Sequence, residues 1–498
     1  MKYYNINKSM VGLVLMTIVV CTSCKKTFLD VNEETNRSTD KNISAALLFP
    51  QGAHGIGARL ASGNLRFLNN WIGYFAAPGD FSIQQDETSY NVDFSFGDAL
   101  WSNSYNALFD LYLTRVKALG VQDSVLAGCA MVLSARLFQD LVDIYGNLPY
   151  SQAFQTTVYR QPAFDKAEDV YKALQASLDT AIIYFTKGTP TDKFGDVDIV
   201  NHGNVDKWIR FANTLKLRLL IHQSERAGFD PTAELQKITD NGGVLLAGEN
   251  ISVNPGYVND ENKQSPFYAN YGLTPAGNEA STSTRANDYM VNLLLSTDDI
   301  RITRFYQPVG TSYVGDTYGL VEGNPLGAAS SKIGPGLAGS ATQGQWIFPS
   351  FESLFLQAEA EARGWLPGNT QQTYETAVTE SFAFLKVPDT VNEARDYLDN
   401  TDIANWANAG SSISDQVKFI GYQKYIALCG IDPVEAWVDL RRIKMLPNSG
   451  YISHNPSKIS TFLPYRLLYP QSEYTANSAN VRAQGDIKLF ETKLFWQP

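Results

Sequence analysis

The sequence is poor in the residues that most often carry enzyme chemistry. It contains only 4 histidines and 4 cysteines in 498 residues, and no two histidines stand at the spacing of metal ligands. It has no HExxH motif, no CxxC pair beyond Cys21 to Cys24, no glycine-rich phosphate loop and no GxSxG nucleophile elbow. These absences predict a protein that is not an enzyme and that has no metal site and no cofactor.

Positive charge is also scarce. Lys and Arg number 40 against 51 Asp and Glu, which gives a net charge of −11 at pH 7, and no basic tract is present. Proteins that bind nucleic acid or anionic membrane surfaces present clustered Lys and Arg. We therefore expect no nucleic acid partner and no direct adsorption to an anionic membrane.

Long hydrophobic runs are missing too, and the run near the N-terminus is short. Met10–Val20 is apolar and follows Lys2 and Lys8. A transmembrane helix needs about 20 apolar residues, so this run predicts the core of a signal peptide over residues 1–23. Ser23 is the small residue that a signal peptidase needs before its cut, and Cys24 follows it.

This pattern predicts cleavage before Cys24 and lipidation of that cysteine, and two or more acyl chains anchor a protein stably. Cleavage before Cys21 would place the bulky Val20 in the small position. An ordinary secreted protein with an incidental cysteine is the other alternative. With Cys24 lipidated, the protein is expected to reach the membrane only through the lipid anchor.

The rest of the chain is predicted to consist of a tether and one globular domain. Residues 24–44 are polar and rich in turn formers, as flexible tethers are, and residues 45–498 follow as a single domain. Cys129 and Cys429 stand in apolar, helical settings. We expect them to be buried free thiols, because a core of this size needs no disulfide.

The segment Ala130–Ala153 has the clearest helical pattern. Two apolar stripes lie side by side along it: Met131, Ala135, Phe138, Val142 and Tyr145, and then Leu133, Leu137, Leu141 and Ile144. A helix that is apolar over most of its circumference must be covered on two sides, so it belongs in the middle of a packed layer. Gly146 and Pro149 predict that the helix ends before GNLPY.

Further helices are predicted from capping residues and apolar spacing. Asp165 with Glu168 resembles a capping box, and Asn204 is a candidate cap for the next helix. The helices are expected near residues 165–185, 204–219, 350–363, 370–386, 416–429 and 433–444. Their pairing predicts a mainly α fold in which tetratricopeptide-like helical pairs form a scaffold, although the repeat consensus is not visible. The long stretches 241–287 and 306–345 predict a loop-rich face, and the tail predicts a few short strands.

Aromatic residues are concentrated between Phe67 and Tyr112, where 12 occur in 46 residues, about double the density of the whole chain. Between Tyr74 and Phe96 they stand on an aperiodic segment with Pro, Gly, Gln and Asp. Exposed rings cover the apolar face of a sugar or peptide group, and amide side chains bond its polar edge. The alternative is that each ring fixes a loop to the scaffold. The predicted ligand-binding residues are Trp71, Tyr74, Gln85, Tyr90, Tyr268, Asn278 and Tyr313.

Several segments, in order along the chain, carry a resemblance to a known family. They include the lipobox followed by FLDVN, LVDIYGNLPYSQAF, WIRFANTLKLRLLIH, FLQAEAEARGW, EAWVDLRRI, PYRLLYPQSEY and the closing FW. The chain resembles the SusD/RagB family of nutrient-binding outer-membrane lipoproteins from Bacteroidetes. The resemblance implies a location at the cell surface in the outer membrane. It also implies a SusC-type TonB-dependent transporter as partner and an oligosaccharide or a peptide as ligand.

The acidic residues offer no catalytic pair. Glu359 and Glu361 are two positions apart on a predicted helix, so they point about 200° apart and cannot flank one bond. In the family this segment is scaffold, and Asp439, Arg441 and Arg442 resemble a structural element that is expected to form a buried ion network. Asp196 and Asp198 could bind calcium, but they belong to no EF-hand pattern.

Two alternatives to a nutrient-binding protein remain open from the sequence. One is a surface-anchored hydrolase of glycans or peptides, which would need a convergent acid and base. The other is a helical adaptor that binds only proteins and no small ligand.

Overall fold

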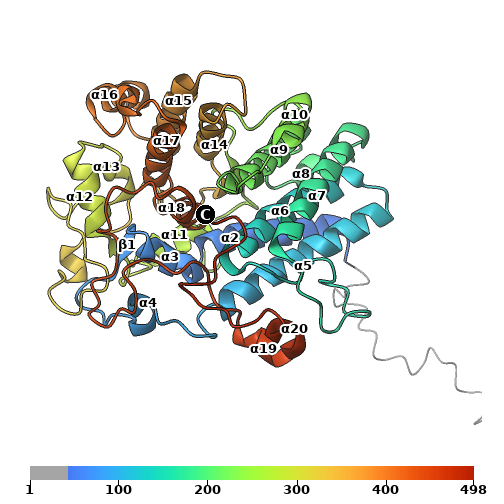
Figure 1. The fold of residues 1–498 in the computed structure, drawn as a ribbon, viewed down its shortest axis with the longest axis horizontal. Coiled ribbons are helices and arrows are strands. Elements are labelled where there is room, and N and C mark those ends of the chain that lie inside the picture. The colour runs from blue at the N-terminus through green and yellow to red at the C-terminus, as the bar shows by residue number, and fades with distance from the viewer. Residues whose placement is uncertain (1–42) are drawn as a thin grey trace, which may run out of the picture. The chain divides into compact units, whose positions relative to one another are not determined.

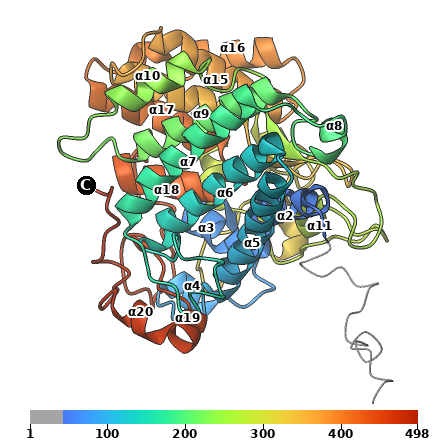
Figure 2. The ribbon, with the colours of Figure 1, turned by 90° about the vertical axis from the view of Figure 1, so that its right-hand side faces the viewer.

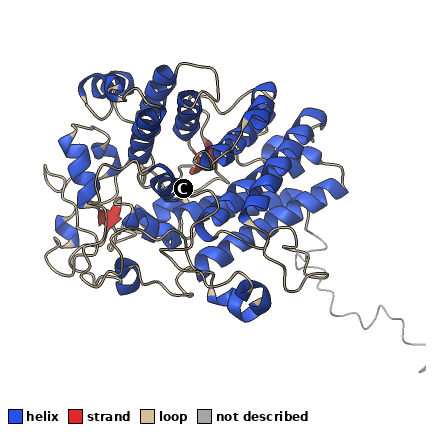
Figure 3. Cartoon of the chain, viewed as in Figure 1, coloured by secondary structure: helices blue, strands red, loops and turns tan. Residues whose placement is uncertain are grey.

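The structure is a computed structural model that describes residues 43–498. The predicted signal peptide, Cys24 and nearly all of the predicted tether lie outside the described residues. Residues Ala45–Pro498 make up one compact unit. It is built mainly of helices and connecting loops, with strands in two small places (Figure 3).

The described residues form 19 α-helices and four strands. The helices are α2 (Ala45–Ala61), α3 (Arg66–Trp71), α4 (Gln85–Ser89), α5 (Asp98–Gly120), α6 (Ser124–Tyr145), α7 (Ala167–Lys187), α8 (Phe194–Val197), α9 (Val205–His222), α10 (Thr232–Asp240), α11 (Pro266–Tyr271), α12 (Asp288–Ser296), α13 (Ile302–Phe305), α14 (Ser350–Ala362), α15 (Thr370–Phe384), α16 (Thr390–Asn400), α17 (Ile413–Ala427), α18 (Pro433–Ile443), α19 (Gln471–Ala476) and α20 (Ser478–Arg482). The strands are β1 (Phe75–Ala76), β2 (Ile251–Val253), β3 (Arg285–Ala286) and β4 (Gln345–Phe348).

Successive helices pack against each other as in tetratricopeptide repeats. Helix α6 packs against α5 and α7, α7 packs against α9, and α14 packs against α15 and α17. Figure 2 shows α5, α6, α7 and α9 side by side. The predicted mainly α scaffold of helical pairs is therefore confirmed. Helix α2, which contains Pro50, packs along α5 and is not among the helices expected from the sequence.

Helix α6 is the central helix that the sequence predicts. The Asp123 carboxylate accepts a hydrogen bond from the backbone N–H of Leu126 at 3.0 Å, and the helix ends at Gly146, whose φ is +79°. Of the described residues, only this helix is long and apolar enough to cross a membrane. Its most apolar 18-residue window is 94% buried inside the protein, as a core helix requires.

Side-chain caps explain most of the predicted helix starts. Asn204 accepts a hydrogen bond from the N–H of Lys207 at 3.0 Å, which confirms it as the cap of α9. The prediction of a capping box at Asp165 is wrong, because the N-cap residue of α7 makes no side-chain capping hydrogen bond. The Asp165 carboxylate instead accepts hydrogen bonds from the N–H groups of Tyr150 and Ser151, at 3.0 and 2.8 Å, and so holds the turn after α6 against the start of α7.

The two long loop stretches are held by two antiparallel strand pairs. Strand β1 pairs with β3, with Phe75 opposite Ala286, and β2 pairs with β4, with Ile251 opposite Phe348. Figure 1 shows that β1, α4, α12 and α13 lie together with long loops at one end of the compact unit. This loop-rich face agrees with the prediction. The C-terminal tail from residue 464 contains loops and the short helices α19 and α20, so the strands predicted there are wrong.

Candidate functional site

Three of the aromatic residues predicted to bind ligand belong to the core. Trp71, Tyr74 and Tyr90 have no exposed surface. The indole N–H of Trp71 donates to the Glu87 carbonyl at 3.1 Å, and the Tyr74 hydroxyl donates to the Tyr425 carbonyl at 2.5 Å. The Tyr90 hydroxyl accepts from the N–H of Ser453 at 2.8 Å. A ring without accessible surface cannot stack on a ligand, so the prediction is corrected for these three residues.

The other four predicted residues lie at the surface but not in one cluster. Gln85 and Asn278 are exposed, and Tyr268 and Tyr313 are half-buried. Within residues 43–498, no hydrogen bond or ring contact joins any two of them. Gln85 accepts a hydrogen bond from the Asn455 amide at 3.3 Å, and the Asn278 N–H donates to the Thr274 hydroxyl at 3.2 Å. Their role in binding stays a prediction.

The aromatic loop region does form a hollow, which we call the loop hollow. It has a volume of about 70 Å³ and lies between α3, the segment from β1 to α4, and the loop 318–324. Its lining includes Arg66, Phe81, Gln84, Glu87, Tyr318 and Asn324. Sequence reasoning missed these residues, although the turn formers around Phe81 gave a signal for an exposed loop.

The walls of the loop hollow are held together by hydrogen bonds between distant segments. The Gly79 N–H donates to the Pro325 carbonyl at 2.7 Å, and the Asn324 amide donates to the carbonyls of Ala77 and Thr317 at 3.3 and 2.9 Å. The Asp80 carboxylate accepts from the N–H of Gly327 at 3.0 Å. The hollow is therefore preformed, which reduces the entropy lost when a ligand binds.

The loop hollow combines an exposed ring with polar groups. The Phe81 side chain is 38% exposed, whereas Glu87 is 4% exposed and accepts hydrogen bonds from the Asn70 amide at 2.7 Å and from the Tyr318 hydroxyl at 3.4 Å. Burial raises the pKa of Glu87. Arg66 is half-buried and makes no ion pair with the part of the chain that the structure describes. A ring, an unpaired guanidinium and amide groups suit an uncharged or acidic ligand with hydroxyl or carbonyl groups.

Comparisons with known proteins decide the family. A family model described as "Starch-binding associating with outer membrane", of the SusD-like type, matches residues 36–470. The chain belongs to the SusD/RagB family. No curated relative matches this SusD-like chain by sequence.

Solved structures of other SusD-like proteins share the fold. A chitin-binding SusD homologue from Flavobacterium johnsoniae has a TM-score of 0.74 and 21% sequence identity, covering 90% of this chain and 98% of that one. A SusD-like protein from Bacteroides thetaiotaomicron has a TM-score of 0.71 and 22% identity, covering 91% and 98%. A SusD homologue from Bacteroides fragilis has a TM-score of 0.73 and 20% identity, covering 91% and 99%.

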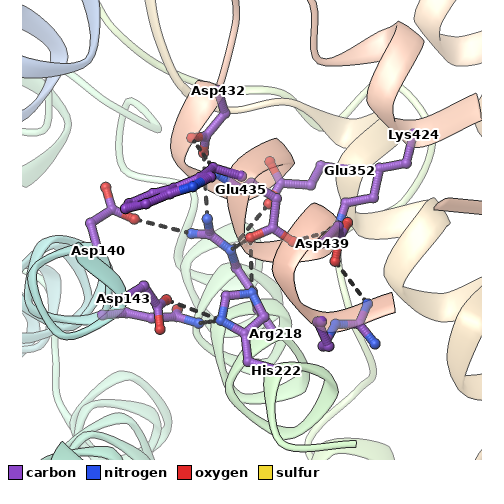
Figure 4. Close-up of polar contacts among 12 residues, drawn as sticks. Asp140, Asp143, Arg218, His222, Glu352, Lys424, Asp432, Glu435 and Asp439 are labelled. Atoms are coloured by element: carbon purple, nitrogen blue, oxygen red, sulfur yellow. Dashed lines mark hydrogen bonds and ion pairs between the residues drawn. The ribbon is translucent and has the colours of Figure 1, made fainter. Parts of the chain in front are cut away.

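A large cluster of titratable groups lies in the core of this SusD-like chain and not at the loop hollow. We call it the ion network, and Figure 4 shows its centre. The Arg218 guanidinium lies 2.6 Å from Glu435, 3.3 Å from Glu352 and 3.5 Å from Asp432. Six helices or their caps contribute: Arg59 from α2, Arg136, Asp140 and Asp143 from α6, Arg218 and His222 from α9, Glu352 and Glu359 from α14, Lys424 from α17, and Asp432, Glu435, Asp439 and Arg442 from α18 and its cap.

The pKa shifts in the ion network follow from charge pairing against burial. Burial raises the pKa of Glu352 to about 8, because Arg218 and Lys424 only partly oppose it, the Glu435 and Asp432 carboxylates add to it, and no hydrogen bond from residues 43–498 reaches its oxygens. Burial disfavours the charged forms of Glu359 and His222 as well. Arg442 nevertheless lowers the pKa of Glu359 to about 2, and the Glu435 and Asp143 carboxylates raise the pKa of His222. The ion network thus shifts the pKa values of two buried glutamates in opposite directions.

The acidic residues that could suggest catalysis are therefore scaffold. Glu359 accepts hydrogen bonds from the Arg442 guanidinium at 2.5 and 2.7 Å, and Arg442 also donates to Asp439 at 2.8 Å. This confirms the ion network predicted for Asp439 and Arg442. Arg441 differs, because it donates to three backbone carbonyls and its guanidinium lies 3.6 Å from the centre of the Trp437 ring.

The candidate calcium ligands do not converge. Both Asp198 oxygens already accept hydrogen bonds, from three backbone N–H groups at 2.9 to 3.1 Å and from the Trp208 indole at 2.8 Å. Asp196 is exposed. In the region 43–498, no group of three or more His, Cys, Asp or Glu is placed to hold a metal ion. Asp198 therefore organises the turn before α9.

Proposed function

We propose that this chain binds an oligomeric nutrient, an oligosaccharide or a peptide, and delivers it to a SusC-type TonB-dependent transporter in the outer membrane. The observation that carries the proposal is the preformed loop hollow on the loop-rich face, in a chain of the SusD/RagB family. Starch binding in the description of the family and chitin binding by a solved homologue make glucose and N-acetylglucosamine oligomers the first ligands to test.

Binding without bond breaking is part of the proposal. The acids of the ion network are buried and lie among cations, and Glu87 is buried and hydrogen-bonded. These acids offer no accessible pair flanking a bond. This favours capture over hydrolysis, and it also favours a cofactor-free site. We expect the affinity to be the same with and without a chelator.

The decisive experiment is calorimetry of the lipidated protein in detergent with maltohexaose, chitohexaose and a library of short peptides. Replacing Phe81 by Ala should weaken the binding of the ligand found by roughly 3- to 10-fold, because one partly exposed ring is lost at the contact. Tyr159→Ala is a matched control, since this aromatic side chain is also exposed, at 39%, and lies outside the hollow. Equal affinities for both variants would place the ligand elsewhere. New products in the same mixtures would support the hydrolase alternative.

Anchoring and partnership need separate tests. We propose that residues 1–23 are removed, that Cys24 is lipidated, and that the tether to residue 44 carries the domain at the cell surface. Metabolic labelling with an alkynyl fatty acid should label the wild-type chain and not Cys24→Ala. Co-purification of a TonB-dependent transporter in detergent would support the transport role, and binding of proteins alone would support the adaptor alternative.

A further inference from the structure

A second cleft lies between α12, α17 and the turn 448–450, away from the lining of the loop hollow. We call it the tyrosine cleft; it has a volume of about 400 Å³ and is lined in part by Asp288, Tyr289, Asn292, Tyr422 and Asn448. Figure 1 shows α12 at the end of the molecule that carries the long loops. Tyr451 supports the cleft, because its ring meets the Tyr289 ring edge to face with centroids 5.8 Å apart.

The polar tips of these tyrosines have no hydrogen-bond partner among the described residues. Within residues 43–498, the hydroxyls of Tyr289, Tyr422 and Tyr451 make no hydrogen bond, and neither does the Asn292 amide. The fully buried tyrosines behave differently. Tyr74 donates to a backbone carbonyl at 2.5 Å and Tyr306 to another at 2.7 Å. Half-buried tyrosines with free hydroxyls beside a cleft are groups that a ligand can satisfy.

The Tyr289 ring is held in place before any ligand arrives. A Cβ atom at Gly450 would lie 2.9 Å from the ring, and one at Gly73, whose φ is +81°, would also lie 2.9 Å from it. Both positions therefore need glycine so that two backbone segments can approach the ring. A fixed ring loses little entropy when it stacks on a ligand.

The charge of the tyrosine cleft disfavours an acidic ligand. No Lys, Arg or His lines it, and its only charged side chain is Asp288. The Asn448 side-chain oxygen Oδ1 accepts from the N–H of Gly450 at 3.0 Å, which leaves the side-chain NH₂ group available to a ligand. Rings that cover apolar faces, together with amides and hydroxyls, are the groups that bind uncharged sugars.

The two sites are connected through one residue. The Thr317 hydroxyl donates to the Asp288 carboxylate at 2.6 Å, and its N–H donates at 2.8 Å to Asn324, which lines the loop hollow. These hydrogen bonds join the wall of the cleft to the wall of the hollow. Two linked contacts raise affinity without any new interaction at either one.

We propose that the tyrosine cleft is a second subsite for a neutral oligosaccharide, which extends from the loop hollow along the Asp288–Thr317–Asn324 connection. The inference rests on the proposed function, because it assumes that the nutrient is a saccharide. It differs from that function in naming a separate contact surface and in excluding acidic sugars.

Calorimetry with chain-length series of maltose and chitin oligomers, and with oligogalacturonate as the acidic probe, tests the inference. We expect affinity for the better neutral series to rise from dimer to hexamer. Tyr422→Ala and Asn292→Ala should each weaken hexamer binding by about tenfold and flatten that rise. Tyr159→Ala is the control for loss of an exposed ring, and thermal melting checks that each variant is folded.

The outcomes separate the inference from the proposed function. If Phe81→Ala weakens hexamer binding but Tyr422→Ala and Asn292→Ala do not change it, the second subsite is overturned and the proposed function is still supported. Binding of peptides only, or tighter binding of oligogalacturonate than of every neutral oligomer, would also overturn it. If the wild-type chain binds none of the oligosaccharides or peptides, both proposals fall.

Discussion

Removing Arg218 tests whether the ion network holds the helical scaffold together. Arg218 is fully buried and lies within 3.6 Å of four carboxyl groups, those of Glu435, Glu352, Asp432 and Asp140. Arg218→Met keeps the length and the apolar contacts of the side chain and removes its charge. Breaking one partner of a buried ion pair costs about 3–5 kcal/mol, because the remaining charge is buried without compensation.

The size of the melting shift follows from the size of the domain. About 450 residues with an unfolding entropy of about 2.1 cal/mol/K each give roughly 1 kcal/mol/K, so the expected loss in Tm is about 3–5 °C. Lys172→Met is the control. Its pairs with Glu168 and Asp169 are exposed, and exposed pairs contribute at most about 1 kcal/mol.

The effect should also depend on pH. In the wild-type chain, burial acts to raise the pKa of Glu435, but Arg218, Lys424 and His222 hold that pKa well below its ordinary value. A carboxyl group with a lowered folded pKa adds stability above its unfolded pKa and loses it as pH falls through the folded value. Without Arg218 this pKa rises, so the gap in Tm between variant and wild type should be larger at pH 8 than at pH 5.

The assay is calorimetric melting of the full-length protein in detergent at pH 5, 6.5 and 8. A Tm within 1 °C of wild type at pH 8, or a gap that does not change with pH, would refute the reasoning, because the four carboxyl groups would then not depend on Arg218 (a 1 °C shift corresponds to roughly 1 kcal/mol here).

Three further predictions follow from the same structure. Burial raises the pKa of Glu352 to about 8, so the wild type loses stability as pH rises from about 4.5 to 8. The Tm of Glu352→Gln minus that of the wild type should therefore increase with pH across this window and stay constant above it. A Tm difference that does not change between about pH 4.5 and 8 would contradict the raised pKa. Cys129 and Cys429 are buried free thiols, and burial raises the pKa of each. A thiol reagent at pH 8 should therefore modify neither cysteine in the native protein and both after denaturation. Rapid labelling of the native protein would show that the core opens. Tyr74→Phe removes the hydroxyl that donates to Tyr425, so the free energy of unfolding should fall by about 1–2 kcal/mol while ligand affinity stays unchanged. Weaker ligand binding without a change in Tm would show that Tyr74 contacts the ligand after all.

The ion network also explains how the chain keeps its layers in register. Its members come from α2, α6, α9, α14, α17 and α18, which span residues 45 to 443. Apolar packing alone allows neighbouring helices to slide, whereas each buried charge needs its partner at one place. We expect the network to fix the relative positions of the helices that carry the loop-rich face.

The helical scaffold could be read from the sequence because its signals are local. The apolar stripes of α6, the Asn204 cap of α9 and the Gly146 stop each depend on residues within a few turns of one another. The Asp165 capping box failed for the opposite reason. Its carboxylate binds N–H groups 14 and 15 residues earlier in the chain, a contact that no local pattern shows.

The sequence by itself determined a mainly helical scaffold and a loop-rich, aromatic region, since composition and periodicity carry this information, and it predicts a leader that is cleaved before Cys24. Only the tertiary structure decided which rings are available to a ligand. Tyr74 is covered because Tyr425 meets it from 351 positions away, and Tyr90 because Ser453 does so from 363 positions away. Phe81 keeps an exposed face because, among the described residues, no distant segment covers its ring as Tyr425 and Ser453 cover the two tyrosines. Whether a side chain is buried depends on such distant partners, and the residues next to it in the sequence do not specify them.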